Sequence, residues 1–219
     1  MTDNSLAHAN TLTIDHRLAL KTAATRLNRE FANFFGTETI ESYLYSSFHQ
    51  SASRATVVNF LPLLAERFAR QRLHALAKAE GKMPTGKPTV LFLCTHNAGR
   101  SHMALGYFTH LAGDHAVAWS GGSEPGHEIN PVAVEAMAEV GIDIAREYPK
   151  PWTEEILHAA DVIITMGCGD ACPIYPGRRY ENWDLPDPDG QPLDVVRGIR
   201  EQIGNRVRGL LDELNIPVD

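Results

Sequence analysis

The chain has 219 residues, of which 43% are hydrophobic, and its net charge is −7. That length suits one large domain, or a medium-sized domain with a small partner, and such a composition supports a packed core. The sequence has no run of about 18 apolar residues, and its N-terminus lacks the charged-then-apolar layout of a secretory signal, so we expect no membrane span and a cytoplasmic protein.

Charge divides the chain in two. Residues 1–87 hold 11 Lys and Arg against 7 Asp and Glu, a net of +4, whereas residues 88–219 hold 9 against 20, a net of −11. Between these halves the segment EGKMPTGKPT, residues 80–89, interrupts helix and sheet alike with Gly and Pro. We therefore predict an N-terminal helical bundle and linker over residues 1–87 and a second domain over residues 88–219.

The first domain has the pattern of three helices. Apolar residues recur at spacings of three and four in residues 15–35, 39–47 and 54–79. Gly36 ends the first of these segments, and Gly81 stands where a helix terminator is expected after the third. The pattern predicts a small three-helix bundle.

The second domain alternates strand-like and helix-like segments. The apolar runs PTVLFLCT and DVIITMG are typical of buried parallel strands, and HAVAWSGG suits another strand. Helical patterns cover residues 100–111, 130–141, 152–160 and 194–214. Such alternation predicts an α/β fold with a doubly wound parallel sheet, which binds ligands at the carboxyl ends of its strands.

Cys94 ends the first of these strands, and a small polar loop then leads to Arg100 and Ser101 at the start of a helix. Inward-pointing N–H groups of such a loop form a cradle for a tetrahedral oxyanion, and the same field favours the thiolate. Arg100 offers a planar fork to two oxyanion oxygens, and Ser101 can hydrogen-bond the sulfur. The pattern predicts a nucleophilic Cys94, although a buried cysteine that merely ends a strand is the alternative. The oxyanion-binding residues would be Thr95, His96, Asn97, Ala98, Gly99, Arg100 and Ser101.

Such a nucleophile needs an acid for the leaving oxygen. The segment NWDLPDPDG, residues 182–190, supplies Asp184, Asp187 and Asp189 in a loop stiffened by proline. Asp187, directly before Pro188, is our candidate, and a solvated acidic turn is the alternative.

The other two cysteines, Cys168 and Cys172, follow the second buried strand among Gly and Pro residues that suit a segment able to rearrange. Three cysteines do not make a framework of structural disulfides. Two thiols beside a nucleophilic thiol suggest a relay by thiol–disulfide exchange. Zinc binding and a purely structural pair of thiols are the alternatives, and we predict no metal site.

The residues CTHNAGRS, the order of strands and helices around them and the later DPDG resemble the low-molecular-weight protein tyrosine phosphatase fold. With Cys168 and Cys172 added, residues 88–219 are similar to the thioredoxin-coupled arsenate reductases of that fold. The helical domain resembles an extension found on some actinobacterial members. The resemblance implies a four-stranded sheet and an enzyme of arsenic detoxification without a tightly bound cofactor.

The resemblance also implies a role for each candidate residue. Cys94 would attack arsenate held by the loop amides and Arg100, while Asp187 protonates the departing oxygen. Cys168 would then attack Cys94 and release arsenite, and Cys172 would take over the disulfide. Thioredoxin is the implied electron donor and partner, although a mycothiol-linked donor stays open.

A tyrosine phosphatase is one alternative function. It would use the same nucleophile, arginine and acid, with water hydrolysing the phosphocysteine. A phosphatase would have no use for the thiol pair, however. Such phosphatases also commonly carry an aromatic residue after the Asp-Pro pair, where Asp189 and Gly190 stand here.

A DNA-binding regulator is the other alternative, because the first domain is basic. Glu66 and Glu80 reduce the positive charge of its third helix, and the sequence has no evident motif for reading bases. We therefore expect no nucleic-acid partner. Its apolar faces are broad for so small a unit. We therefore expect the bundle to pack against the second domain, or against its copy in a homodimer.

Overall fold

The structure, a computed structural model, describes residues 12–52, 60–83, 86–167 and 174–218. The chain divides into two units, Met1–Pro84 and Thr85–Asp219, and the division falls inside the Gly- and Pro-rich segment noted above. Among the helices that the structure describes, none is long and apolar enough to cross a membrane.

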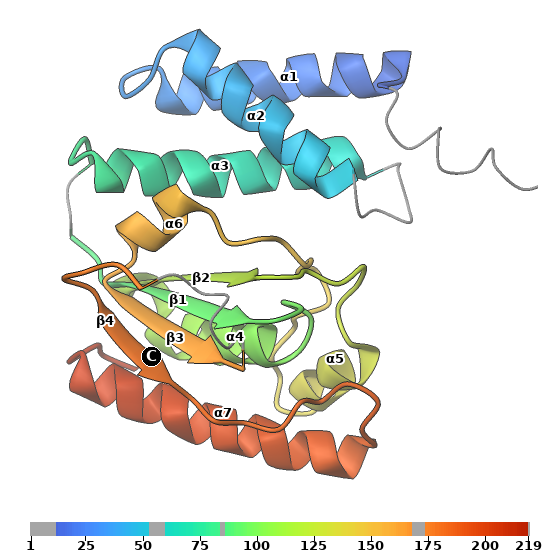
Figure 1. The fold of residues 1–219 in the computed structure, drawn as a ribbon, viewed down its shortest axis with the longest axis vertical. Coiled ribbons are helices and arrows are strands. Elements are labelled where there is room, and N and C mark those ends of the chain that lie inside the picture. The colour runs from blue at the N-terminus through green and yellow to red at the C-terminus, as the bar shows by residue number, and fades with distance from the viewer. Residues whose placement is uncertain (1–11, 53–59, 84–85, 168–173, 219) are drawn as a thin grey trace, which may run out of the picture. The chain divides into compact units, whose positions relative to one another are not determined.

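The described residues of the N-terminal unit form three helices, α1 (Ile14–Phe31), α2 (Thr37–Ala52) and α3 (Leu61–Ala79), which Figure 1 labels. Leucine and isoleucine side chains from all three helices are fully buried between them, among them Leu20, Ile40, Leu44 and Leu73. The predicted three-helix domain is confirmed.

The ends of α3 are set by local sequence. The helix begins at Leu61, and its first turn contains Pro62, whose missing N–H costs nothing at a helix start. Residues 54–59 of the predicted helix lie outside the described residues. At the other end Gly81 adopts a left-handed φ of 66°, and Lys82 N–H donates to the Ala77 carbonyl at 2.8 Å. This arrangement is the glycine terminator that the sequence predicts.

One buried carboxylate ties α1 to α3. The Glu66 side chain is only 5% exposed, and it accepts hydrogen bonds from Arg26 Nε at 2.8 Å and from Arg70 Nη2 at 2.9 Å. The hydrogen bond from Arg26 lowers the pKa of Glu66, although burial alone would raise it. The carboxylate is therefore charged and paired in the folded unit.

The C-terminal unit contains a parallel sheet of strand order β2-β1-β3-β4. Its strands are β1 (Thr89–Cys94), β2 (Val117–Gly122), β3 (Val162–Met166) and β4 (Arg179–Asn182). The predicted four-stranded parallel sheet is confirmed. The position of β4 escaped the sequence analysis, because its four residues, RYEN, are polar and lie at the sheet edge with no apolar run to mark them.

Helices cover both faces of this sheet, as a doubly wound fold requires. Figure 1 shows α6 (Glu154–Ala159) on the side of the sheet opposite to α7 (Leu193–Glu213). The helices α4 (Arg100–Ala112) and α5 (Pro131–Ala138) share a core with α7 and with the β1 side chains Val90 and Phe92. The short 3-10 helix η1 (Gly113–His115) follows α4.

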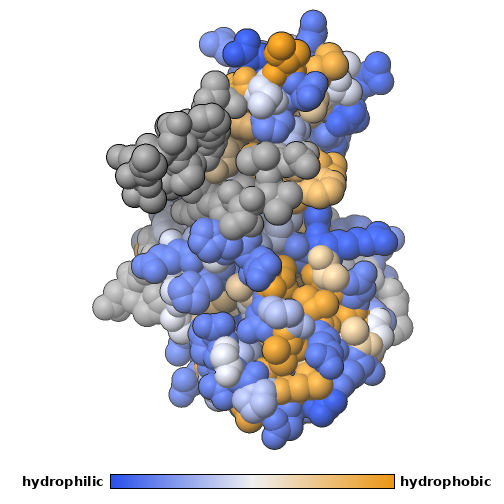
Figure 2. Space-filling model, turned by 90° about the vertical axis from the view of Figure 1, so that its right-hand side faces the viewer, coloured by the Kyte–Doolittle hydropathy of each residue, from blue (hydrophilic) through white to orange (hydrophobic). Residues whose placement is uncertain are grey.

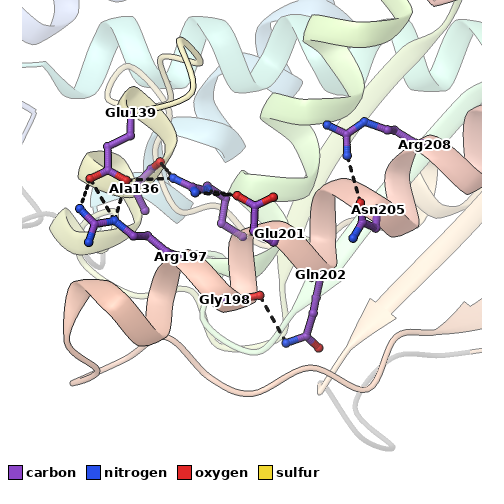
Figure 3. Close-up of polar contacts among 9 residues, drawn as sticks. Ala136, Glu139, Arg197, Gly198, Glu201, Gln202, Asn205 and Arg208 are labelled. Atoms are coloured by element: carbon purple, nitrogen blue, oxygen red, sulfur yellow. Dashed lines mark hydrogen bonds and ion pairs between the residues drawn. The ribbon is translucent and has the colours of Figure 1, made fainter.

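An ion cluster fixes α7 to the end of α5 (Figure 3). Glu139 accepts hydrogen bonds from Arg197 Nε at 2.8 Å and from Arg200 Nη1 at 3.0 Å. The hydrogen bonds from Arg197 and then Arg200 lower the pKa of Glu139 to about 2. Arg200 also donates to the Ala136 carbonyl at 2.7 Å, so the cluster provides a hydrogen-bond donor for a carbonyl group in the last turn of α5.

Trp183 links β4 to the core. The residue follows the strand, is buried, and its ring centroid lies 5.9 Å from that of Phe92. Its indole Nε1–H donates to Glu181 at 3.2 Å. The chain then continues through Leu185 into the acidic segment at the carboxyl edge of the sheet.

Because the strands are parallel, their carboxyl ends meet at one edge. Cys94, the last residue of β1, pairs with Gly122 of β2 and Met166 of β3. Figure 2 looks at this side of the C-terminal unit and shows apolar patches bordered by hydrophilic side chains. The loops that leave this edge build the site described next.

Candidate active site

A chain of hydrogen bonds ends at the sulfur of Cys94. Asn97, buried and in a left-handed conformation with φ of 46°, accepts a hydrogen bond at Oδ1 from the Lys150 N–H at 2.9 Å. That N–H can only donate, so the orientation of the amide is fixed and Nδ2 donates to Ser101 Oγ at 2.8 Å. The Ser101 hydroxyl hydrogen is left for Cys94 Sγ, 3.0 Å away. This series of bonds therefore directs the Ser101 hydroxyl hydrogen at the Cys94 sulfur.

The loop after Cys94 turns its carbonyl groups outward. Three of them accept hydrogen bonds at 2.9, 2.8 and 2.9 Å, in the pairs Thr95 O with Glu124 N, His96 O with Gly126 N and Ala98 O with Asn130 N. Within the described parts of the chain, no N–H group of residues 96–101 donates to a protein acceptor. These N–H groups, at the N-terminus of α4, are available to an oxyanion.

Arg100 stands at the start of α4 with its guanidinium almost fully buried. Nη1 donates to the Leu185 carbonyl at 3.2 Å, and Nη2 forms an ion pair with Asp187. Gly167, directly after β3, lies beneath the guanidinium, since a methyl group on it would come 2.7 Å from Nη1. Its carbonyl accepts a hydrogen bond from Thr95 Oγ1 at 2.8 Å.

The acidic segment, residues 187–189, lies against the oxyanion loop. Asp187 is about half exposed, and besides Arg100 it accepts a hydrogen bond at Oδ1 from the Asp189 N–H at 3.1 Å. Pro188 packs on Gly99, where a methyl group would lie only 2.6 Å from Pro188 Cγ. The glycine at 99 is thus required for the close approach of the two segments.

The loop, the acidic segment and the start of α5 enclose a cleft of about 340 Å³. Cys94, Gly99 and Arg100 line it on one side, and residues 126–131 and 187–189 line it on the other. A cleft of that size at the carboxyl edge of a parallel sheet holds a small ligand.

The structure brings most of the sequence-predicted site residues to this cleft. Cys94, Arg100 and Asp187 border it, and Ser101 contacts the sulfur. Among the loop residues, His96 also lines the cleft, and its Nδ1–H donates to the Glu124 carbonyl at 3.1 Å. Cys168 and Cys172 lie outside the described residues. Within those residues, no three His, Cys, Asp or Glu side chains gather as a metal site requires.

Three site residues escaped the sequence analysis. Gly122 and Gly167 follow the strands beside β1 and let the loop backbone and the arginine approach closely, with a methyl group on Gly122 only 2.6 Å from the Thr95 carbonyl oxygen. Asn130 contacts two of the site's segments. A Gly at the end of each strand and the Asn-Pro pair at a helix start are the signals that could have found them.

The fold, with a buried cysteine at the end of β1 and an arginine at the start of α4, defines a class of phosphatase-like proteins. Residues 89–218 match the family described as low molecular weight phosphotyrosine protein phosphatase, and the chain belongs to that family. Residues 20–77 match the protein-tyrosine-phosphatase-like, N-terminal domain.

Among the most similar proteins are arsenate reductases. A solved thioredoxin-dependent arsenate reductase from Corynebacterium glutamicum is 42% identical, with a TM-score of 0.83 over 91% of this chain and 98% of that one. Arsenate reductase 2 of Staphylococcus epidermidis is 41% identical over 53% of this chain and 91% of its own length. The low molecular weight protein tyrosine phosphatase of T. tengcongensis is 29% identical, with a TM-score of 0.53 over 58% of this chain and 99% of that one.

Proposed function

We propose that the chain is an arsenate reductase, which converts arsenate to arsenite with electrons from thioredoxin. The observation that carries the proposal is the buried Cys94 sulfur at the floor of a cleft lined by free N–H groups and by Arg100. Arsenate is a tetrahedral anion that suits such a cleft. The similarity to arsenate reductases, including a thioredoxin-dependent one, supports this choice of substrate and donor.

In the first step the Cys94 thiolate attacks arsenic. A sulfur–arsenic bond forms and one arsenic–oxygen bond breaks, while Asp187 gives its proton to the departing oxygen, which leaves as water. Arg100 and the loop N–H groups bind the remaining oxygens and stabilise their charge. Arsenic is still in its higher oxidation state after this step, so a reductant must follow.

The reductant is the thiol pair, which we assign from the sequence and the resemblance. Cys168 attacks the Cys94 sulfur, so that a disulfide forms, the sulfur–arsenic bond breaks and its electron pair leaves with arsenite. Cys172 then attacks Cys168, frees Cys94 and leaves a Cys168–Cys172 disulfide, which thioredoxin reduces. Such a cycle needs no tightly bound cofactor. It needs a reducing compartment, so we expect the enzyme to act in the cytoplasm.

The walls of the cleft support a small inorganic substrate. Among the described residues that line it, none is Phe, Tyr or Trp, so none of these large rings is there to stack on a phosphotyrosine ring. Glu128 and Asp189 instead add negative charge near Asp187 at the rim.

The test is arsenate-dependent NADPH oxidation coupled through thioredoxin and thioredoxin reductase. We expect turnover in the wild type and its loss in Cys94→Ser, Cys168→Ser and Cys172→Ser. A mycothiol-linked system run in parallel identifies the donor. Full turnover in the Cys168→Ser variant would contradict the relay, and no turnover in the wild type with either donor would contradict the proposed function.

A phosphatase is the second candidate, because the nucleophile, arginine and acid are arranged as a phosphoryl transfer would also require. An aryl phosphate substrate separates the two functions. We expect weak hydrolysis that survives both Cys168→Ser and Cys172→Ser. A wild type that hydrolyses phosphotyrosine efficiently and does not reduce arsenate would favour the phosphatase.

We further propose that copies of the chain associate through the N-terminal helical unit as a homodimer. Four large apolar side chains of that unit are strongly exposed, namely Ile14, Leu18, Phe60 and Leu63. Sedimentation over a range of protein concentrations tests this. We expect Leu18→Glu to shift the equilibrium toward the monomer, whereas a wild type that is monomeric throughout would contradict it.

A further inference from the structure

We propose that Asn130 is a positioning residue of the reaction, which holds the acidic segment 187–189 over Cys94 while it caps helix α5. The inference rests on the proposed function in one respect, namely that Asp187 is the acid of the first step. No motif in the sequence assigns this task to Asn130.

The side chain of Asn130 makes contacts on two sides. Its Oδ1 accepts hydrogen bonds from the N–H groups of Val132 at 2.9 Å and Ala133 at 3.1 Å, which is the capping arrangement of a helix N-terminus. Because those N–H groups can only donate, the orientation of the amide is fixed. Nδ2 therefore faces the Pro188 carbonyl, to which it donates at 3.3 Å.

The backbone of Asn130 reaches the third segment of the site. Its N–H donates to the Ala98 carbonyl at 2.9 Å, so the same residue contacts the oxyanion loop, the acidic segment and the first turn of α5. The position of Pro188 relative to Ala98 and Gly99 is thereby fixed by hydrogen bonds as well as by the packing of its ring.

This contact matters because the residue that forms an ion pair with Asp187 must also bind substrate. Arg100 forms an ion pair with Asp187 in the structure, yet the same guanidinium is the one placed to bind the oxyanion. When Arg100 turns to arsenate, the Pro188 carbonyl is still held by Asn130. Asn130 thus keeps the carboxyl group of Asp187 near the leaving oxygen at the moment when its proton is needed.

The central variant is Asn130→Ser. Serine caps a helix about as well as asparagine, but its side chain is too short to reach the Pro188 carbonyl. We expect kcat/KM for arsenate to fall about fivefold, as suits the loss of one neutral hydrogen bond. Asn205→Ser, an exposed asparagine on α7, is the matched control and should leave kcat/KM unchanged. Thermal unfolding of both variants should match the wild type.

A double variant separates positioning from a structural role. If Asn130 acts through the acid, Asn130→Ser should cause no further loss in the Asp187→Asn background, because no proton donor is left to position. Losses that multiply in the double variant would overturn the proposal. Inhibition by inorganic phosphate should be unchanged in Asn130→Ser, since the oxyanion loop keeps its backbone contacts.

Amide exchange gives a readout that does not depend on the substrate. Gln191 N–H donates to the same Pro188 carbonyl at 3.2 Å, so its hydrogen exchange, and that of Asp189, should accelerate in Asn130→Ser. Unchanged exchange and unchanged kcat/KM would overturn the proposal. If the wild type does not reduce arsenate, the proposed function is refuted. The comparison of hydrogen exchange still tests whether Asn130 holds the acidic segment. If the serine variant does not fold, Asn130→Asp, which caps but cannot donate, takes its place.

Discussion

Gly99 and Pro188 are in direct contact, and a methyl group on Gly99 would lie 2.6 Å from Pro188 Cγ. The oxyanion loop and the acidic segment are therefore packed directly against each other, and no side chain fits between them at this point. A proline ring cannot rotate away as the tip of a long side chain can, so a substitution at Gly99 has to displace the backbone of the acidic segment.

The first prediction follows from this contact. Gly99→Ala should push Asp187 from its place and lower kcat/KM for arsenate by about tenfold to a hundredfold, since misplacement of an acid by a fraction of a bond length is costly. Gly209→Ala is the control, because a methyl group on this exposed α7 glycine meets no atom within 4 Å. Equal activity of both variants would contradict the prediction.

The second prediction concerns the hydrogen bond from Ser101 to the sulfur. Ser101→Ala should slow alkylation of Cys94 at neutral pH by about tenfold, because a hydrogen bond to a charged group is lost. The measurement uses the Cys168→Ser, Cys172→Ser background, in which Cys94 is the sole thiol of a three-cysteine chain. Ser120→Ala, which removes a buried hydroxyl bonded to Lys150 Nζ at 3.2 Å, should leave the alkylation rate unchanged.

The third prediction concerns the hydroxyl of Thr95, which holds the Gly167 carbonyl at 2.8 Å just before the segment that carries the thiol pair. Thr95→Val keeps the shape of the side chain and removes the donor. We expect arsenate turnover to fall about fivefold while alkylation of Cys94 is unaffected. Thr95→Ser keeps the hydroxyl and should restore turnover, and a serine variant as slow as the valine variant would count against this role.

The fourth prediction is a pH dependence of stability. The hydrogen bonds from Arg197 and Arg200 lower the pKa of Glu139 to about 2, so this carboxylate stabilises the folded state at any pH above its unfolded pKa. The stabilisation is lost as the pH falls from about 4.3, the usual value for Glu, through the folded pKa.

The measurement is urea unfolding of the wild type and Glu139→Gln, followed by tryptophan fluorescence. All three tryptophans lie in the C-terminal unit, so the signal reports on the unit that contains Glu139. The difference in the free energy of unfolding should be constant above about pH 5 and shrink below about pH 4. A difference that stays constant down to about pH 2 would refute it.

The sequence predicted those parts of the fold that depend on local pattern. The buried run that ends in Cys94, the helix that begins at Arg100 and the glycine terminator at Gly81 were all visible as residue types at fixed spacings. β4 was missed because a short polar edge strand is defined by its pairing with β3 rather than by its own composition.

Some contacts of the site could likewise be predicted from the local sequence, and others could not. Ser101 and Cys94 stand in the same short stretch of sequence, and the bond from the hydroxyl to the sulfur was foreseen from their spacing. The roles of Gly167 and Asn130 depend on segments that the fold brings together, such as Arg100 above Gly167 and Pro188 beside Asn130. No single stretch of sequence contains both partners of these contacts.

The buried Trp183 is a natural fluorescent probe placed beside the site. The indole ring packs against Phe92 on the strand that carries the nucleophile, and two residues later the Leu185 carbonyl is bound by Arg100. A rotation of the guanidinium toward an arriving anion would break its bond to that carbonyl and disturb the chain beside this ring. We therefore expect the emission of Trp183 to change when an anion enters the cleft, so that binding can be followed without a label or a coupled enzyme.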